Sequence, residues 1–171
     1  MNKKSVSANG IEVAKHYEGC RLEAYPDPGS KDGHPWTIGY GHTGPEVRKG
    51  LVWTQSKADA VFPVDIGSFE RDVISLVTVP LTQGQFDALV LFAMNCGSDI
   101  DADSLAEGLG DSTLLRLLNE GDYSGAREEF AKWVKNDGKT MLGLKRRRRS
   151  EQGLWDGLDA KAAIAVGARV R

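Results

Sequence analysis

Two carboxylates and one hydroxyl in the N-terminal part of this 171-residue chain could form a catalytic set. Glu18 stands just before a glycine, Asp27 lies nine positions later in a turn flanked by prolines, and Thr37 falls in a Gly-rich, β-branched stretch. Hydrolysis of a glycosidic bond uses one carboxylic acid to protonate the leaving oxygen and one carboxylate to activate water or attack the sugar. Surface acids are common, so this spacing by itself does not exclude two solvated charges.

The surrounding pattern predicts the elements that would position these groups. Asn9 and Glu12 have the spacing of a capping box, so we expect a helix that ends at Gly19 and carries Glu18 in its last turn. Alternation predicts strands, and a small antiparallel sheet would then bear Asp27 and Thr37. The expected strands are Arg21–Tyr25, Trp36–Tyr40 and Leu51–Trp53.

The chain after Thr54 has helical periodicity. Thr54 can cap a segment to Phe62, Pro63 would kink or restart it, and residues 64–77 read as a long connecting helix. Thr82 and Gln85 predict a second capping box, which opens an apolar helix expected to be the core of a second lobe. Further helices are expected at Thr113–Asn119, at Tyr123–Val134 and around Lys145–Trp155, with loops at 97–110 and 138–143.

These elements predict an α+β fold that is mostly helical. A small N-terminal lobe with a β-sheet, at 10–62, is joined by the helix at 64–77 to a larger helical lobe at 80–158, and 159–171 is a basic tail. We expect an extended polymer to lie between the lobes.

Composition narrows the class of protein. The chain is 40% hydrophobic and 27% charged, as is usual for a globular domain, and no apolar run reaches the length of a membrane span. No apolar segment follows the basic N-terminus, so we read no export signal. Cys20 and Cys96 do not form a CxxC pair, and the histidines are dispersed, so we expect reduced thiols, no metal site and no cofactor. A disulfide between Cys20 and Cys96 stays open as the alternative. His42 is expected to make structural hydrogen bonds.

The residues quoted above belong to longer motifs. E-G-x-R-L-x-A-Y-x-D at 18–27, followed by T-I-G-Y-G-H-T at 37–43, resembles the phage-type lysozymes, or endolysins, of glycoside hydrolase family 24. The resemblance continues in the same order over residues 10–158, and several collinear motifs are more specific than one short pattern. The later matching segments are Val79–Gln83, Gln85–Leu89, Ser112–Leu115, Gly121–Tyr123, Phe130–Trp133 and Gly143–Arg148.

This resemblance implies a lysozyme-like fold and a muramidase that cuts the β-1,4 bond between N-acetylmuramic acid and N-acetylglucosamine. Glu18 matches the general acid, expected in partly apolar surroundings that favour its protonated form, Asp27 the carboxylate that orients water, and Thr37 the hydroxyl that holds it. The resemblance favours inversion through that water, for which the carboxyl groups would be roughly 6.5–9.5 Å apart, and a separation of roughly 5–5.5 Å would favour a covalent route instead. The loop from Pro28 to Trp36 is longer than in the commonest family pattern, and its Asp32 remains an alternative to Asp27.

The residue types of the candidate substrate-binding residues indicate their function less specifically than those of the three catalytic candidates do. Tyr25, Trp36 and Tyr40 could stack on sugar rings or belong to the core. Gln85 and Asn95 could reach substrate amides or serve in capping and packing.

The charge is unevenly spread. Residues 1–131 carry −9 and residues 132–171 carry +7, which favours an anionic partner near the C-terminus. The run Lys145–Arg149, including Arg146, could contact anionic groups of peptidoglycan, bind nucleic acid, or form a solvated face paired with Glu128 and Glu129. Without interleaved aromatic residues we expect no nucleic-acid partner, while the tail could contact lipopolysaccharide.

Together with the lack of an export signal, the resemblance implies that the protein accumulates in the host cytoplasm and reaches the wall through a separate membrane pore. The oligomeric state stays open, and a monomer is the default expectation. Three alternatives stay open. They are a non-catalytic wall-binding protein, a nucleic-acid binder, and an enzyme with a chitinase-like preference.

Overall fold

The computed structural model describes residues 4–27, 34–101 and 107–171. The chain forms two compact units. Residues 14–67 form the first, called here the sheet unit, and the residues up to Val13 together with Ser68–Arg171 form the second, called here the helical unit. Helices α1 (Ala8–Glu18) and α2 (Gln55–Leu76) contribute to both units.

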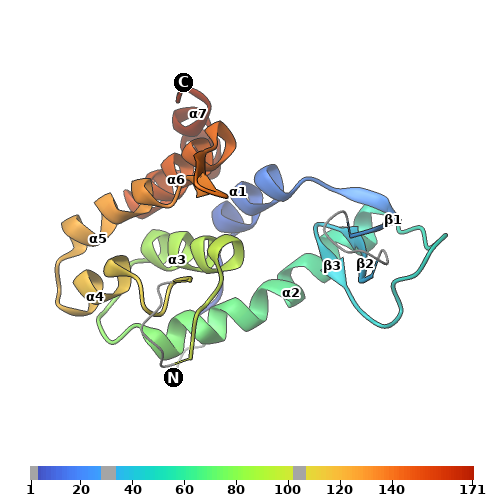
Figure 1. Cartoon of the computed structure of the whole chain (residues 1–171), viewed down its shortest axis with the longest axis horizontal. Helices are drawn as coiled ribbons and strands as arrows, with labels where there is room; N and C mark the ends of the chain where they lie inside the picture. The colour runs from blue at the N-terminus through green and yellow to red at the C-terminus, as the bar shows by residue number, and fades with distance from the viewer. Residues whose placement is uncertain (1–3, 28–33, 102–106) are drawn as a thin grey trace. The chain divides into compact units, whose positions relative to one another are not determined.

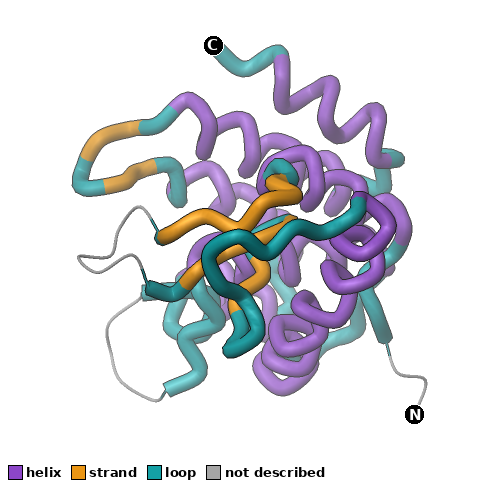
Figure 2. The backbone as a smooth tube through the Cα atoms, turned by 90° about the vertical axis from the view of Figure 1, so that its right-hand side faces the viewer, coloured by secondary structure: helices purple, strands orange, loops and turns teal. Residues whose placement is uncertain are grey.

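Three antiparallel strands in the order β1-β2-β3 build the sheet unit (Figure 2). Strands β1 (Arg21–Pro26) and β2 (Trp36–Gly39) pair with Tyr25 opposite Thr37, and β3 is His42–Thr43. The third strand expected at 51–53 is wrong, because Val52 makes only an isolated bridge to Glu23. A small core of Ala24, Ile38 and Val47 holds the sheet together, with Trp36, Leu51 and Trp53 packed against it.

Helix α1 ends where the sequence predicted but begins differently. It stops at Glu18, and Gly19 follows with φ +67°, a conformation in which a residue without Cβ is unstrained. The predicted cap at Asn9 is wrong, since the carbonyl of Ser7 accepts from the Ile11 N–H at 2.9 Å. Ser7 is in turn fixed by Asp87, which accepts its N–H at 3.0 Å, so a tertiary contact determines the start of the helix.

Helix α2 begins as expected, with Thr54 Oγ1 accepting from the N–H of Lys57 at 3.1 Å. It then runs for 22 residues through Pro63, so the expected restart there is wrong. Proline removes one backbone hydrogen bond, but Phe62 and Ile66 on either side are buried, and this packing keeps the helix continuous.

The helical unit is built around α3 (Gln83–Cys96), whose residues Phe86–Ala93 are buried. Its predicted capping box is confirmed: Thr82 Oγ1 accepts from the Gln85 N–H, and the Gln85 side chain accepts from the Thr82 N–H. Figure 1 shows α7 beside α6, and α6 also packs on α3. The other elements are α4 (Thr113–Asn119), α5 (Tyr123–Glu129), a 3-10 turn at Phe130–Lys132, β4 (Lys135–Asn136), β5 (Lys139–Thr140), α6 (Leu142–Trp155) and α7 (Ala160–Ala168).

Two C-terminal elements differ from expectation. The loop predicted at 138–143 is partly a hairpin, β4–β5, which turns through Asp137 and Gly138 at φ +48° and +74°. The predicted tail forms α7, which Asp159 caps by accepting from the Ala162 N–H. Ala163 and Gly167 of α7 are buried, so the tail is part of the helical unit.

Candidate active site

Glu18 is the last residue of α1 and precedes β1 by only two residues. The Gly19 N–H donates to the Lys15 carbonyl at 3.1 Å, which closes the helix just after Glu18 and turns the chain toward the sheet. The Glu18 side chain is exposed. The partly apolar surroundings that the sequence predicted for Glu18 stay a prediction.

Asp27 and Thr37 are brought together by the pairing of β1 with β2. Beyond the last strand pair, the Asp27 N–H donates to the Pro35 carbonyl at 3.1 Å, which extends the ladder by one step. Side chains alternate along paired strands, so Asp27 falls on the same face of the sheet as Thr37 and is its diagonal neighbour. Diagonal neighbours on paired strands typically have Cα atoms about 7–8 Å apart. Thr37 is only 9% exposed. Asp32, the alternative carboxylate, lies outside the described residues.

A polar cluster joins α1 to α2 and to the turn after β2. The Lys15 ammonium lies 2.5 Å from Asp59 Oδ1, the Tyr40 hydroxyl donates to the same oxygen at 3.0 Å, and the Gln55 amide reaches it at 3.2 Å. We call Lys15, Tyr40, Gln55 and Asp59 the Asp59 network. The hydrogen bond from Lys15 is the largest cause that lowers the pKa of Asp59, while burial, followed by the bond to Asp59, raises the pKa of Tyr40.

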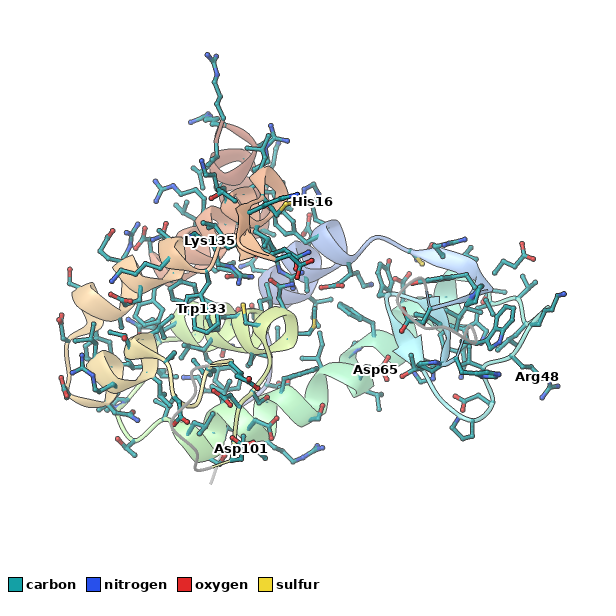
Figure 3. The ribbon with its side chains drawn as sticks, viewed as in Figure 1. His16, Arg48, Asp65, Asp101, Trp133 and Lys135 are labelled. Carbon is teal, nitrogen blue, oxygen red and sulfur yellow. The ribbon has the colours of Figure 1, made fainter. Side chains whose placement is uncertain are left out.

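His42, on strand β3, contacts two carboxylates. Its Nδ1 lies 2.9 Å from Asp65 Oδ1, and its Nε2 lies 2.9 Å from Glu46 Oε1. Figure 3 shows Asp65 on α2. Burial by itself would lower the pKa of His42, but the hydrogen bonds to Glu46 and Asp65 outweigh it, and the pKa is raised. The expectation of a structural, hydrogen-bonding histidine is confirmed.

The three aromatic residues considered for sugar stacking all have partners within the sheet unit. The Arg21 guanidinium lies over the Tyr25 ring, 3.9 Å from its centroid, and Trp36 packs on the small core. The Tyr40 ring packs on Phe62 with centroids 4.9 Å apart. These contacts give each ring a structural role, and sugar stacking stays a prediction.

The remaining candidates lie in the helical unit. Gln85 serves in the capping box of α3. Asn95 is exposed and accepts from Arg148 Nη2 at 2.7 Å, while Arg146 Nε donates to the Val170 carbonyl at 3.2 Å. Contacts of Gln85, Asn95 and Arg146 with substrate stay predictions.

Only part of the run Lys145–Arg149 is the solvated face considered from the sequence, since Lys145 and Arg149 are exposed. Arg147 and Arg148 are 6% and 1% exposed, and both pair with Glu151, which is fully buried. Arg148 also donates to Cys96 Sγ at 2.7 Å. The expected partners are engaged elsewhere, Glu128 with Arg127 and Glu129 with Lys132. Two of the four arginines therefore stabilise the interior.

Within the described residues, no group of three His, Cys, Asp or Glu side chains could hold a metal ion. Cys20 and Cys96 are both free thiols. None of the helices in the described ranges has the length and apolar character needed to cross a membrane.

The chain is similar to known proteins over most of its length. The family model described as phage lysozyme matches residues 15–151. The endolysin of Acyrthosiphon pisum secondary endosymbiont phage 1 is 39% identical over 88% of this chain and 97% of that protein. The endolysin of Bacillus phage B103 is 40% identical, but the chain spans only 54% of its length. The muramidase domain of SpmX from Asticaccaulis excentricus superposes with a TM-score of 0.75 at 37% identity, over 88% of this chain and 97% of that one.

Proposed function

Because this chain belongs to the phage lysozyme family, we propose that it is a muramidase acting on bacterial peptidoglycan. The bond cut is the β-1,4 linkage between N-acetylmuramic acid and N-acetylglucosamine. The observation that carries this proposal is the arrangement of Glu18, Asp27 and Thr37 in one compact unit that the family match covers.

Each group has a role that its position supports. Glu18, accessible at the end of α1, protonates the glycosidic oxygen as the bond breaks. Asp27 activates a water molecule, and the nearby Thr37 hydroxyl, held in the sheet, helps to orient it for attack on the anomeric carbon. The two acids stand on different elements, so their surroundings can differ enough for one to donate a proton and the other to accept one.

The biological role follows from the same assignment. Cleavage of the glycan strands would lyse the host cell and release phage, as the name endolysin says of the relatives. We further propose that the protein acts as a monomer and reaches the wall from the host cytoplasm through a separate membrane pore. Lipopolysaccharide contact would use the exposed cations at the C-terminus, Lys161, Arg169 and Arg171.

The test compares wild type with Glu18→Gln on purified peptidoglycan and on outer-membrane-permeabilised Gram-negative cells. We expect Glu18→Gln to lose activity by about 10²–10⁴-fold while keeping its thermal unfolding midpoint, because the substitution removes only the transferable proton. Mass spectrometry should find reducing muramic acid ends only with wild type. Equal lysis by both proteins would refute the role of Glu18.

Two comparisons resolve the alternatives. Asp27→Ala should abolish activity and Asp32→Ala should not, and the reverse result would assign the water to Asp32. Binding of cell walls by wild type without release of reducing sugar would identify a non-catalytic binding protein, and faster cleavage of chitin than of peptidoglycan would change the substrate.

A further inference from the structure

Two large apolar side chains lie exposed in the helical unit where strand β5 meets helix α6. Met141 is 44% and Leu142 is 43% exposed. Each has a lysine beside it. Lys139 precedes Met141 by two residues, so the two side chains fall on one face of the β4–β5 ribbon, and Lys145 follows Leu142 by three residues on α6. We call these four residues the junction surface.

The backbone holds the junction surface in a fixed conformation. The Met141 N–H donates to the Val134 carbonyl at 2.8 Å, which extends the β4–β5 ladder, and the Met141 carbonyl accepts from the Lys145 N–H at 3.0 Å, which closes the first turn of α6. Trp133 packs its ring edge-on against Phe92 of the buried helix α3, with centroids 5.2 Å apart. Figure 2 shows the ribbon projecting beyond the helices on either side of it. An anchored element therefore presents the exposed apolar side chains.

The two lysines of the junction surface are open to an anionic partner. Both are exposed, and neither Lys139 nor Lys145 has an acidic partner within the part of the chain that the structure describes. Residues 132–149 contain eight lysines or arginines and a single acid, Asp137. The positive charge at this surface is therefore not neutralised by its own segment.

Exposed apolar groups among cations indicate a partner that is itself amphiphilic. Protein segments that lie in a bilayer interface place apolar side chains among the acyl chains, while lysines bury their aliphatic part and keep the ammonium at the phosphates. Peptidoglycan and nucleic acids also carry anionic groups, but neither has an apolar layer to receive Met141 and Leu142. Charge complementarity together with the apolar pair thus favours an anionic lipid surface.

We propose that the junction surface docks on an anionic phospholipid bilayer, with its two lysines at the headgroup phosphates and its two apolar side chains in the outer part of the acyl layer. The inference goes beyond the proposed function, because docking on a bilayer involves no catalytic group and no glycan. It also differs from the lipopolysaccharide contact proposed above, which uses the cations at the C-terminus.

The experiment measures cosedimentation of the full chain with vesicles of phosphatidylglycerol and phosphatidylcholine in equal parts, and with vesicles of phosphatidylcholine alone. One double variant, Lys139→Gln with Lys145→Gln, removes the cations, and another, Met141→Ala with Leu142→Ala, removes the apolar groups.

Each double variant has a matched control elsewhere on the protein. The charge control is Lys49→Gln with Lys57→Gln, two exposed lysines of the sheet unit. The apolar control is Val64→Ala with Ile74→Ala, two exposed side chains of α2 that are 75% and 50% exposed. All substituted side chains are exposed, so we expect every variant to keep its thermal unfolding midpoint.

Wild type should bind the vesicles that contain phosphatidylglycerol and not those of phosphatidylcholine alone, and added salt should weaken the binding. Loss of both lysines should lower the binding constant about 30-fold. Loss of Met141 and Leu142 should lower it about tenfold, because their exposed parts no longer enter the acyl layer. Both controls should stay within about twofold of wild type.

Three results would overturn the inference. They are no binding of wild type to phosphatidylglycerol vesicles at low salt, a loss in the control variants equal to that in the junction variants, and unchanged binding when Met141 and Leu142 are replaced. Wild type that binds purified peptidoglycan through the two lysines, but binds no vesicles, would assign this surface to wall carboxylates instead. The vesicle assay needs no cleavage, so a protein that binds vesicles and does not cleave peptidoglycan would refute only the proposed function.

Discussion

Replacing Glu151 with glutamine removes the charge from the most deeply buried ion pair in the described parts of the chain. Glu151 is 0% and Arg148 is 1% exposed, and Oε2 lies 2.7 Å from Arg148 Nε as an ionic contact without hydrogen-bond alignment. Arg148 Nη2 donates to Oε1 at 2.8 Å, and Arg147 Nε donates to it at 3.3 Å. Burial raises the pKa of Glu151, and the two guanidinium groups oppose that rise.

The expected cost follows from leaving two arginines without their buried counter-ion. Breaking such a pair on one side costs about 3–5 kcal/mol, and glutamine keeps an acceptor oxygen, so we expect about 3 kcal/mol. For a chain of this size, that lowers the melting temperature by about 6–12 °C. The matched control is Glu120→Gln in the exposed Arg116–Glu120 pair, where the loss should be about 0.3–0.5 kcal/mol.

Urea unfolding, followed by circular dichroism and by tryptophan fluorescence, measures both variants. Two probes are needed because a chain of two units need not unfold in one step. Replacing the pair together, as Arg148→Met with Glu151→Leu, should cost less than Glu151→Leu alone, because it leaves one buried arginine, Arg147, without its counter-ion instead of two. The reasoning fails if Glu151→Gln costs no more stability than Glu120→Gln. It also fails if the cost of the double variant Arg148→Met with Glu151→Leu equals the sum of the costs of its two single changes.

Two further predictions concern pH and packing. The pKa of His42 is raised in the folded state, so its contribution to stability is complete below about pH 6.5 and is lost as pH rises through the raised value. His42→Gln should therefore cost about 1 kcal/mol at pH 5.5 and less at pH 8.5, and an equal cost at both would show that the charge does not matter. Gly84→Ala should destabilise by about 1–3 kcal/mol, because its Cβ would lie 2.1 Å from the Leu154 carbonyl oxygen. Gly143→Ala, which meets nothing within 4 Å, should instead be neutral or stabilise by about 0.5–1 kcal/mol, and similar melting temperatures for these two variants would contradict this packing.

The parts of the fold that the sequence predicted well depend on partners close in the chain. The capping box of α3 joins Thr82 and Gln85, and the end of α1 depends on the conformation of Gly19. Both signals lie within one helical turn, so residue type and spacing were sufficient. The start of α1 was missed for the opposite reason. The helix begins just after Ser7 because the Ser7 N–H donates to Asp87, which lies eighty residues away in the chain.

Two C-terminal elements were missed although local signals existed. The Asp137-Gly138 dipeptide is typical of a tight hairpin turn, but strands of two residues show no alternation that could support it. Asp159 caps α7, yet the face that this helix buries consists of alanine and glycine, whose weak hydrophobicity looks like an unstructured tail.

The candidate site also combines residues close in the chain with contacts between distant residues. Glu18, Asp27 and Thr37 lie within twenty residues of one another, and their types suit acid–base chemistry, but the longer motifs around them were needed to single them out. The Asp59 network, in contrast, depends on an ion pair between residues 44 positions apart, and no periodicity connects Lys15 to Asp59. Evidence for Arg148 was nevertheless present, since Glu151 follows it by three residues on the same helix and could satisfy it internally. A run of like charges should therefore be checked for an acid one turn away before it is taken as a binding surface.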